Sequence, residues 1–165
     1  MQYPADFIKA IPKADLHLHL DGSLRASSLI DMAKRASIEL PSYTEEGLFD
    51  QVFKSHYNNL GEYLNGFQYT CAALRNLENL EQAAYELAID NQEEGVNYIE
   101  VRFAPQLLMN PAAGVTFDTI MHVVNDGLKR ATAGVIFLLD VDTIVPDGAL
   151  RKLTELVKKN PDWIV

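Results

Sequence analysis

Two histidines, His17 and His19, stand two residues apart near the start of the chain. Successive side chains of an extended strand alternate between its faces, so both imidazoles point the same way, together with Asp15 and Asp21. Two neutral imidazole nitrogens that converge are suitable ligands for zinc or a similar transition ion. Such a pair also occurs by chance on a surface, or as hydrogen-bonded histidines in a core, and the spacing alone leaves these alternatives open.

The context of the pair favours a metal-binding strand. Leu16, Leu18 and Leu20 fall on the opposite face, which predicts a buried strand with one polar side. Gly22 follows the strand and allows a sharp turn. Only four histidines occur in the chain, so two of them in one short strand make a chance arrangement less attractive.

The length and composition limit the function further. The chain has 165 residues, enough for one domain but fewer than the roughly 250 of a complete (β/α)8 barrel. Its net charge of -9 argues against binding nucleic acid through phosphates. Cys71 is the single cysteine, which excludes an intrachain disulfide and a cysteine zinc cluster. Without a leader-like or membrane-spanning apolar run, we expect no membrane contact and a cytoplasmic location.

The periodicity of apolar residues alternates between helical and extended along the chain. It predicts strands at 13–21, 96–103, 135–141 and from 163 onward, and helices at about 23–36, 59–75, 78–94, 116–130 and 147–159. For the first helix, Ser23 or Ser27 is the expected cap. Strands that alternate with helices imply parallel βαβ units. The prediction is an α/β chain folded as the N-terminal half of a (β/α)8 TIM barrel, with residues 1–165 forming one incomplete barrel domain.

The second strand has the same two-sided pattern as the first. Its apolar face carries Ile99, Val101 and Phe103. On its polar face, Glu100 and Arg102 are expected to line the barrel interior and to pair as structural ions.

Four stretches carry a resemblance to a known family. They read Ile11-Pro-Lys-Ala-Asp-Leu-His-Leu-His-Leu-Asp-Gly-Ser23, then Leu-x-x-Tyr-Leu-x-x-Phe from Leu60 to Phe67, then Glu94-Gly-Val-x-Tyr-x-Glu-Val-Arg-Phe-Ala-Pro105 with Gln106-Leu-Leu108, and finally Asn125-Asp-Gly-Leu128. In this order they resemble the adenosine deaminase family of metal-dependent aminohydrolases, over about the first 130 residues.

The resemblance implies roles for individual residues. It implies that His17 and His19 are zinc ligands at the C-terminal mouth of the first strand, that His19 also lies close to the nucleoside, and that Asp21 contacts the ribose. It further implies that a helix covers the purine pocket with four apolar side chains, namely Leu60, Tyr63, Leu64 and Phe67. Their spacing of three and four is equally typical of a stripe buried in a core, and both interpretations can hold for different residues.

The activity implied by the resemblance is hydrolytic deamination of adenosine to inosine and ammonia, with Zn²⁺ as cofactor and a purine nucleoside as substrate. The family's third zinc histidine, its His-Ala-Gly-Glu segment with the proton-donating glutamate, its base histidine and its paired aspartates do not occur in these 165 residues. His56 and His122 fall outside the expected positions and are interpreted as surface or helix-packing residues. We therefore expect no catalytic residue in this chain, and no turnover by the chain alone.

The last thirty residues are different in character. The segment Leu139-Asp-Val-Asp-Thr143 is similar to the Asp-x-Asp segment of family 2 glycosyltransferases, which implies that Asp140 and Asp142 bind a divalent cation and a nucleotide-sugar. The alternative is a strand-end turn with solvated carboxylates. The change of resemblance predicts a junction near residue 132.

Three hypotheses follow from the sequence. The first is the N-terminal part of a zinc-dependent adenosine deaminase. The second is a glycosyltransferase-like donor site at Asp140 and Asp142. The third is a non-catalytic half-barrel or fusion product that associates with itself, because a half-barrel leaves sheet edges and apolar faces exposed.

Overall fold

A computed structural model describes residues 3–131 and the strand Ile136–Phe137. In chain order the elements are α1 Ala5–Ala10, β1 Lys13–His19, α2 Ala26–Ala36, α3 Glu45–Gln51, α4 Leu60–Asn65, α5 Phe67–Leu74, α6 Leu77–Glu93, β2 Val96–Arg102, the 3-10 turns Pro105–Leu107 and Pro111–Ala113, α7 Phe117–Ala131, and β3 Ile136–Phe137. The predicted alternation of strands and helices is confirmed.

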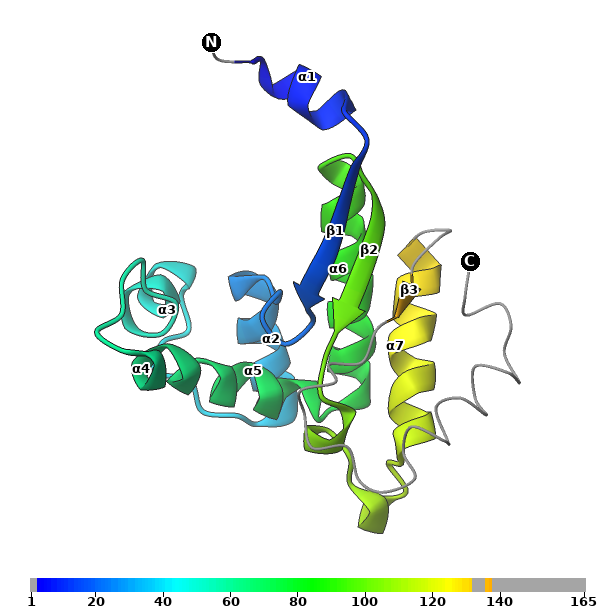
Figure 1. Cartoon of the computed structure of the whole chain (residues 1–165). Helices are drawn as coiled ribbons and strands as arrows, with labels where there is room; N and C mark the ends of the chain where they lie inside the picture. The colour runs from blue at the N-terminus through cyan, green and yellow to red at the C-terminus, as the bar shows by residue number, and fades with distance from the viewer. Residues whose placement is uncertain (1–2, 132–135, 138–165) are drawn as a thin grey trace.

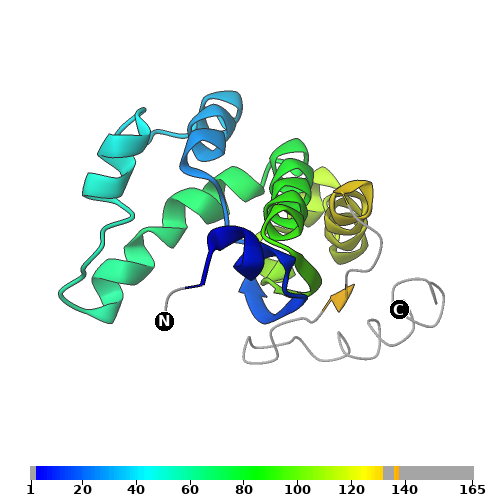
Figure 2. The same cartoon turned by 90° about the horizontal axis from the view of Figure 1, so that it is seen from above.

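The described strands form a parallel sheet in the order β1-β2-β3 (Figure 1). In the register of this sheet, His19 lies beside Arg102 and Val101 lies beside Phe137. Helices α6 and α7 pack along the same face of the sheet, as the view from above shows (Figure 2). Consecutive strands that pair in parallel through a covering helix are the βαβ arrangement that the sequence predicted.

The core lies between this sheet and its helices. The apolar faces predicted for the sheet and helices are buried: Ile99, Val101, Phe103, Leu80, Ala83, Ala84, Leu87, Ala88, Ile120, Val124 and Leu128. Helices α6 and α7 approach closely at Gly127, where a Cβ would lie 2.4 Å from the Glu81 carbonyl oxygen.

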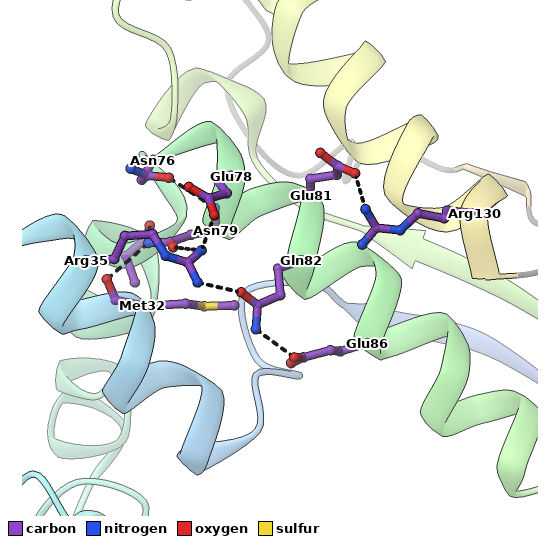
Figure 3. Close-up of polar contacts among 10 residues, drawn as sticks. Met32, Arg35, Asn76, Glu78, Asn79, Glu81, Gln82, Glu86 and Arg130 are labelled. Carbon is purple, nitrogen blue, oxygen red and sulfur yellow. Dashed lines mark hydrogen bonds and ion pairs between the residues drawn. The ribbon is translucent and has the colours of Figure 1, made fainter.

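A polar network joins α2 to α6 beside this core (Figure 3). The Asn79 side chain is fully buried and donates to the carbonyls of Met32 at 3.2 Å and Ala73 at 2.9 Å. Its Oδ1 accepts from the Arg35 guanidinium at 3.0 Å. Both Nδ2 protons and the Oδ1 of this carboxamide therefore have partners within the protein, which reduces the penalty for burying it.

Two helix predictions were wrong in detail. The helix expected over 59–75 is divided at Gly66 into α4 and α5. Helix α2 begins after Arg25, which makes no side-chain cap, so neither Ser23 nor Ser27 is the cap residue. Ser23 donates its hydroxyl to the His19 carbonyl at 2.6 Å, and Ser27 lies inside the helix. Its predicted end at Ala36 is confirmed.

The strands also differ from expectation. Leu20 is buried, but Leu16 is 56% exposed, so the apolar face predicted for β1 is covered only in part within the described residues. The predicted pairing of Glu100 with Arg102 was wrong. Glu100 accepts from the Tyr98 hydroxyl at 3.0 Å, and Arg102 Nε is buried without a partner in the described part of the chain.

Two short helices, α1 and α3, were not predicted, because each is too short to show a clear apolar period. The strand predicted at 135–141 is seen at Ile136–Phe137. The elements predicted at 147–159 and 163–165, together with Asp140 and Asp142, lie outside the described residues. Across residues 3–131, no helix combines the length and apolar character that a membrane crossing requires.

Candidate functional site

The predicted metal pair is brought together at the end of β1. His17 Nε2 and His19 Nε2 lie 3.0 Å apart, with the two rings tilted by 40°. Two nitrogens bound to one tetrahedral zinc at its usual bond length lie about 3.3 Å apart, so the observed separation needs little adjustment to accept the ion. Both side chains reach solvent, and the pair can therefore take up a metal without opening the fold.

The backbone around the pair is fixed by the turn that follows β1. The His19 carbonyl accepts from the Gly22 amide at 3.2 Å and from the Ser23 hydroxyl at 2.6 Å. On the other side, Leu20 donates its amide to the Arg102 carbonyl at 2.9 Å. These bonds hold the end of β1 on both sides and fix the backbone from which the His19 side chain projects.

Asp21 lies next to the pair in a largely buried position. Its Oδ1 is 3.8 Å from His19 Nδ1 and has no hydrogen-bond partner within the described residues. Burial raises the pKa of Asp21 above its ordinary value, an effect that the neighbouring His19 opposes. An unpaired, buried carboxylate oxygen beside two metal-type ligands is able to accept a hydrogen bond from a bound molecule.

Helices α4 and α5 form the wall beside this turn. A Cβ placed on Gly22 would lie 3.6 Å from both the His19 Cβ and the Phe67 ring, so Phe67 borders the turn that follows β1. Tyr63 meets Phe67 edge to face, with ring centroids 5.5 Å apart. Since Leu60 and Leu64 are 69% and 51% exposed, the core interpretation is wrong for these two residues, and their faces are open to a ligand.

Residues that the sequence did not assign to the site also contribute. Cys71 Sγ lies 3.9 Å from Asp21 Oδ2, and burial raises the pKa of this thiol. Cys71 follows Asp21 by 50 positions, so no local pattern could connect them. Tyr57 stacks edge to face on Tyr63 at 5.2 Å and extends the aromatic wall.

The described residues bring together two imidazoles of the type that binds zinc, without a third candidate ligand. Across residues 3–131, no group of three or more histidine, cysteine, aspartate or glutamate side chains could hold a metal ion together. His56 and His122 both lie at the surface, as predicted. The pair thus fits two corners of a tetrahedral shell.

Comparisons with known proteins identify the family of the chain. The family model described as "Adenosine deaminase" matches residues 12–160. An adenosine deaminase of Clostridium botulinum is 38% identical over 162 residues, which cover 94% of this chain and 47% of that protein. The chain thus spans about half the length of this curated relative.

Solved structures of deaminases and amidohydrolases share the fold of this chain. The N6-methyl-AMP deaminase of Arabidopsis thaliana has a TM-score of 0.74 at 21% identity, over 98% of this chain and 49% of that one. A zinc-bound amidohydrolase of Burkholderia ambifaria has a TM-score of 0.71 at 18% identity, over 97% of this chain and 44% of that one. The described fold is therefore part of a TIM barrel of the adenosine deaminase type, and by the extent of the family match the chain belongs to the adenosine deaminase family.

Proposed function

We propose that this chain forms the N-terminal half of the barrel of a zinc-dependent purine nucleoside deaminase, which hydrolyses adenosine to inosine and ammonia. The observation that carries the proposal is the 3.0 Å approach of His17 Nε2 to His19 Nε2, beside the buried Asp21 carboxylate. An imidazole pair suits zinc, and a neighbouring acceptor suits a hydroxyl-bearing ligand such as a ribose. The proposal keeps the cytoplasmic location and the absence of a nucleic-acid partner expected from the sequence.

The residues of this chain have separate tasks in the proposed reaction. His17 and His19 would hold Zn²⁺, which when bound supplies a hydroxide nucleophile from water near neutral pH. Asp21 would accept a hydrogen bond from the ribose. Four side chains would form the apolar wall against which the purine lies and from which water is excluded: Leu60, Tyr63, Leu64 and Phe67.

We further propose that the chain alone does not turn over substrate. Proton transfer to the purine ring needs a positioned acid, and handling the attacking water needs a base. The described site offers Asp21 and two metal-type histidines, and the sequence lacks the family's His-Ala-Gly-Glu segment. Production of inosine by pure, zinc-loaded chain would overturn this part of the proposal.

The alternatives from the sequence are less well supported. The family match continues to residue 160 and includes Asp140 and Asp142, which favours one continuous barrel segment over a glycosyltransferase-like donor site. The junction near residue 132 stays a prediction.

The proposed metal site is tested by the zinc content of the purified chain, measured by elemental analysis after dialysis. We expect close to one zinc per chain in the wild type and close to none after the joint replacement of His17→Ala and His19→Ala. His56→Ala, which removes a surface histidine, is the matched control and should retain zinc. Equal zinc content in all three proteins would exclude His17 and His19 as the ligands.

A further inference from the structure

The helix that carries most of the proposed purine wall buries none of its own residues, and Tyr63 alone of them makes aromatic contacts in the described part of the chain. Helix α4 contributes Leu60, Tyr63 and Leu64 to that wall and has no buried residue. A six-residue helix without packing is unstable in water, because too few hydrogen bonds offset the cost of ordering its backbone. Other contacts must therefore fix its position.

These contacts converge on Glu62, which lies in the first turn of α4. Its Oε1 accepts from Lys54 Nζ at 3.1 Å, and its Oε2 accepts from both the backbone amide and the Nδ2 of Asn58 at 2.8 Å. We call Glu62, Lys54 and Asn58 the Glu62 latch. Both oxygens of one carboxylate thus bind the helix to the segment that precedes it, and charge-assisted bonds of this length are the stronger kind.

The residues of the Glu62 latch are not closely packed on one side. A cavity of about 340 Å³ lies beside it, lined by Lys54, Tyr57, Glu62, Asn65 and Gln68 among others. The side of α4 that carries Glu62 therefore faces a hollow instead of a filled core. At its other end α4 meets α5 at Gly66, a residue without a side chain to restrain the joint.

Aromatic contacts connect α4 to the turn that follows β1. Tyr57, which is anchored by its hydroxyl to the Val52 carbonyl at 3.0 Å, meets Tyr63 edge to face at 5.2 Å. Tyr63 in turn meets Phe67, whose ring borders Gly22. A shift of α4 would move Tyr63 relative to Phe67 and alter the wall beside His19.

We propose that Glu62 is a positioning residue: through the latch with Lys54 and Asn58 it holds α4 so that Leu60, Tyr63 and Leu64 face the bound purine. This inference rests on the proposed function for the identity of the ligand. It assigns to Glu62 no contact with the substrate.

The test compares adenosine binding by wild type, Glu62→Ala and Lys54→Met in isothermal titration calorimetry. Loss of the latch should weaken binding about fivefold to tenfold in Glu62→Ala, and less in Lys54→Met, which keeps the Asn58 bonds. Zinc content should not change. The matched control is Glu81→Gln, which breaks the Arg130–Glu81 ion pair at similar exposure on α6 and should bind like the wild type.

A double-mutant cycle separates positioning from general loss of structure. In a Tyr63→Ala background, Glu62→Ala should weaken binding by less than twofold, because the wall that Glu62 positions is already impaired. Equal weakening in both backgrounds, or wild-type affinity of Glu62→Ala, would overturn the inference.

Hydrogen exchange without ligand keeps the latch testable if the proposed function fails. If the wild type does not bind adenosine, the nucleoside proposal is wrong for this chain. The amides of α4 should still exchange faster in Glu62→Ala than in wild type, while those of α6 should not. Unchanged exchange in α4 would show that the latch does not hold the helix.

Discussion

The Arg35 guanidinium donates a 3.0 Å hydrogen bond to Asn79 Oδ1, and through this bond a surface cation of α2 meets a carboxamide that has no exposure to solvent. The two Nδ2 protons of Asn79 are used by the carbonyls of Met32 and Ala73. The Asn79 side chain thus forms hydrogen bonds with three groups, the guanidinium and one carbonyl of α2 and one carbonyl of α5 (Figure 3).

Replacement of Asn79→Leu should destabilise the chain by roughly 2–4 kcal/mol, because it removes the Nδ2 donor from the buried Met32 and Ala73 carbonyls and the Oδ1 acceptor from the Arg35 guanidinium. The free energy of unfolding in urea measures this. Asn91→Ala is the control, since the bond that the Asn91 side chain makes among the described residues is to the Leu87 carbonyl of its own helix, and Asn91 is less deeply buried. Similar losses in the two variants would contradict a special role for Asn79.

The contact of α6 with α7 gives a second prediction. Gly127→Ala would bring a methyl group to 2.4 Å from the Glu81 carbonyl and 2.9 Å from the Ala84 Cβ, so the helices must separate. We expect a loss of about 1–3 kcal/mol in the free energy of unfolding. Gly66→Ala, which would meet its nearest neighbour at 3.5 Å in a helical conformation, should change stability by less than about 1 kcal/mol.

Asp21 gives a prediction about pH. Since burial raises its pKa above 3.8, the folded chain binds this proton more tightly than the unfolded chain does. The free energy of unfolding therefore falls as pH rises from 3.8 through the pKa of the folded state, and Asp21 costs stability at neutral pH.

The measurement is thermal unfolding of Asp21→Asn against wild type, with a chelator present to remove metal. The variant should melt at a higher temperature at about pH 7, and the difference should close near pH 3. Asp31→Asn, which alters an exposed carboxylate, should show no such trend. If Asp21→Asn is less stable than wild type at neutral pH, the buried Asp21 carboxylate does not lower the free energy of unfolding.

The exposed edge of β1 gives a prediction about assembly. Leu16 is 56% exposed on a strand whose outer edge is unpaired in the described sheet, which favours pairing with a second copy. Light scattering at tens of micromolar should show a dimer or larger species, and Leu16→Lys should shift it toward monomer. A wild-type monomer mass would exclude self-association.

The sequence predicted those parts of the fold in which apolar periodicity is strong. Helices α6 and α7 repeat apolar residues every three or four positions over four turns, and both were found within one residue of the predicted ends. Helix α3 has one buried residue, Leu48, and leaves no period to detect. The helical period continues unbroken across Gly66, so it could not predict the division between α4 and α5.

The site was predictable only where its residues are neighbours in the chain. The spacing of His17 and His19 predicted their convergence, because strand geometry alone sets it. The contact of Asp21 with Cys71 on α5, and the lack of a partner for Arg102 Nε among the described residues, both depend on tertiary packing. Contacts between residues that lie far apart in the chain cannot be predicted from the local spacing of residue types.

The parallel pairing of β1 with β2 also shapes how this chain folds. The partner of β1 in the sheet follows it by about eighty residues, since Lys13 lies beside Val96. During synthesis, β1 and its leucines must therefore wait without a hydrogen-bonding partner until α6 and β2 have been made. The strand that bears both histidines is thus made long before β2, its partner in the described sheet, and aggregation of the nascent chain in that interval would compete with completion of the site.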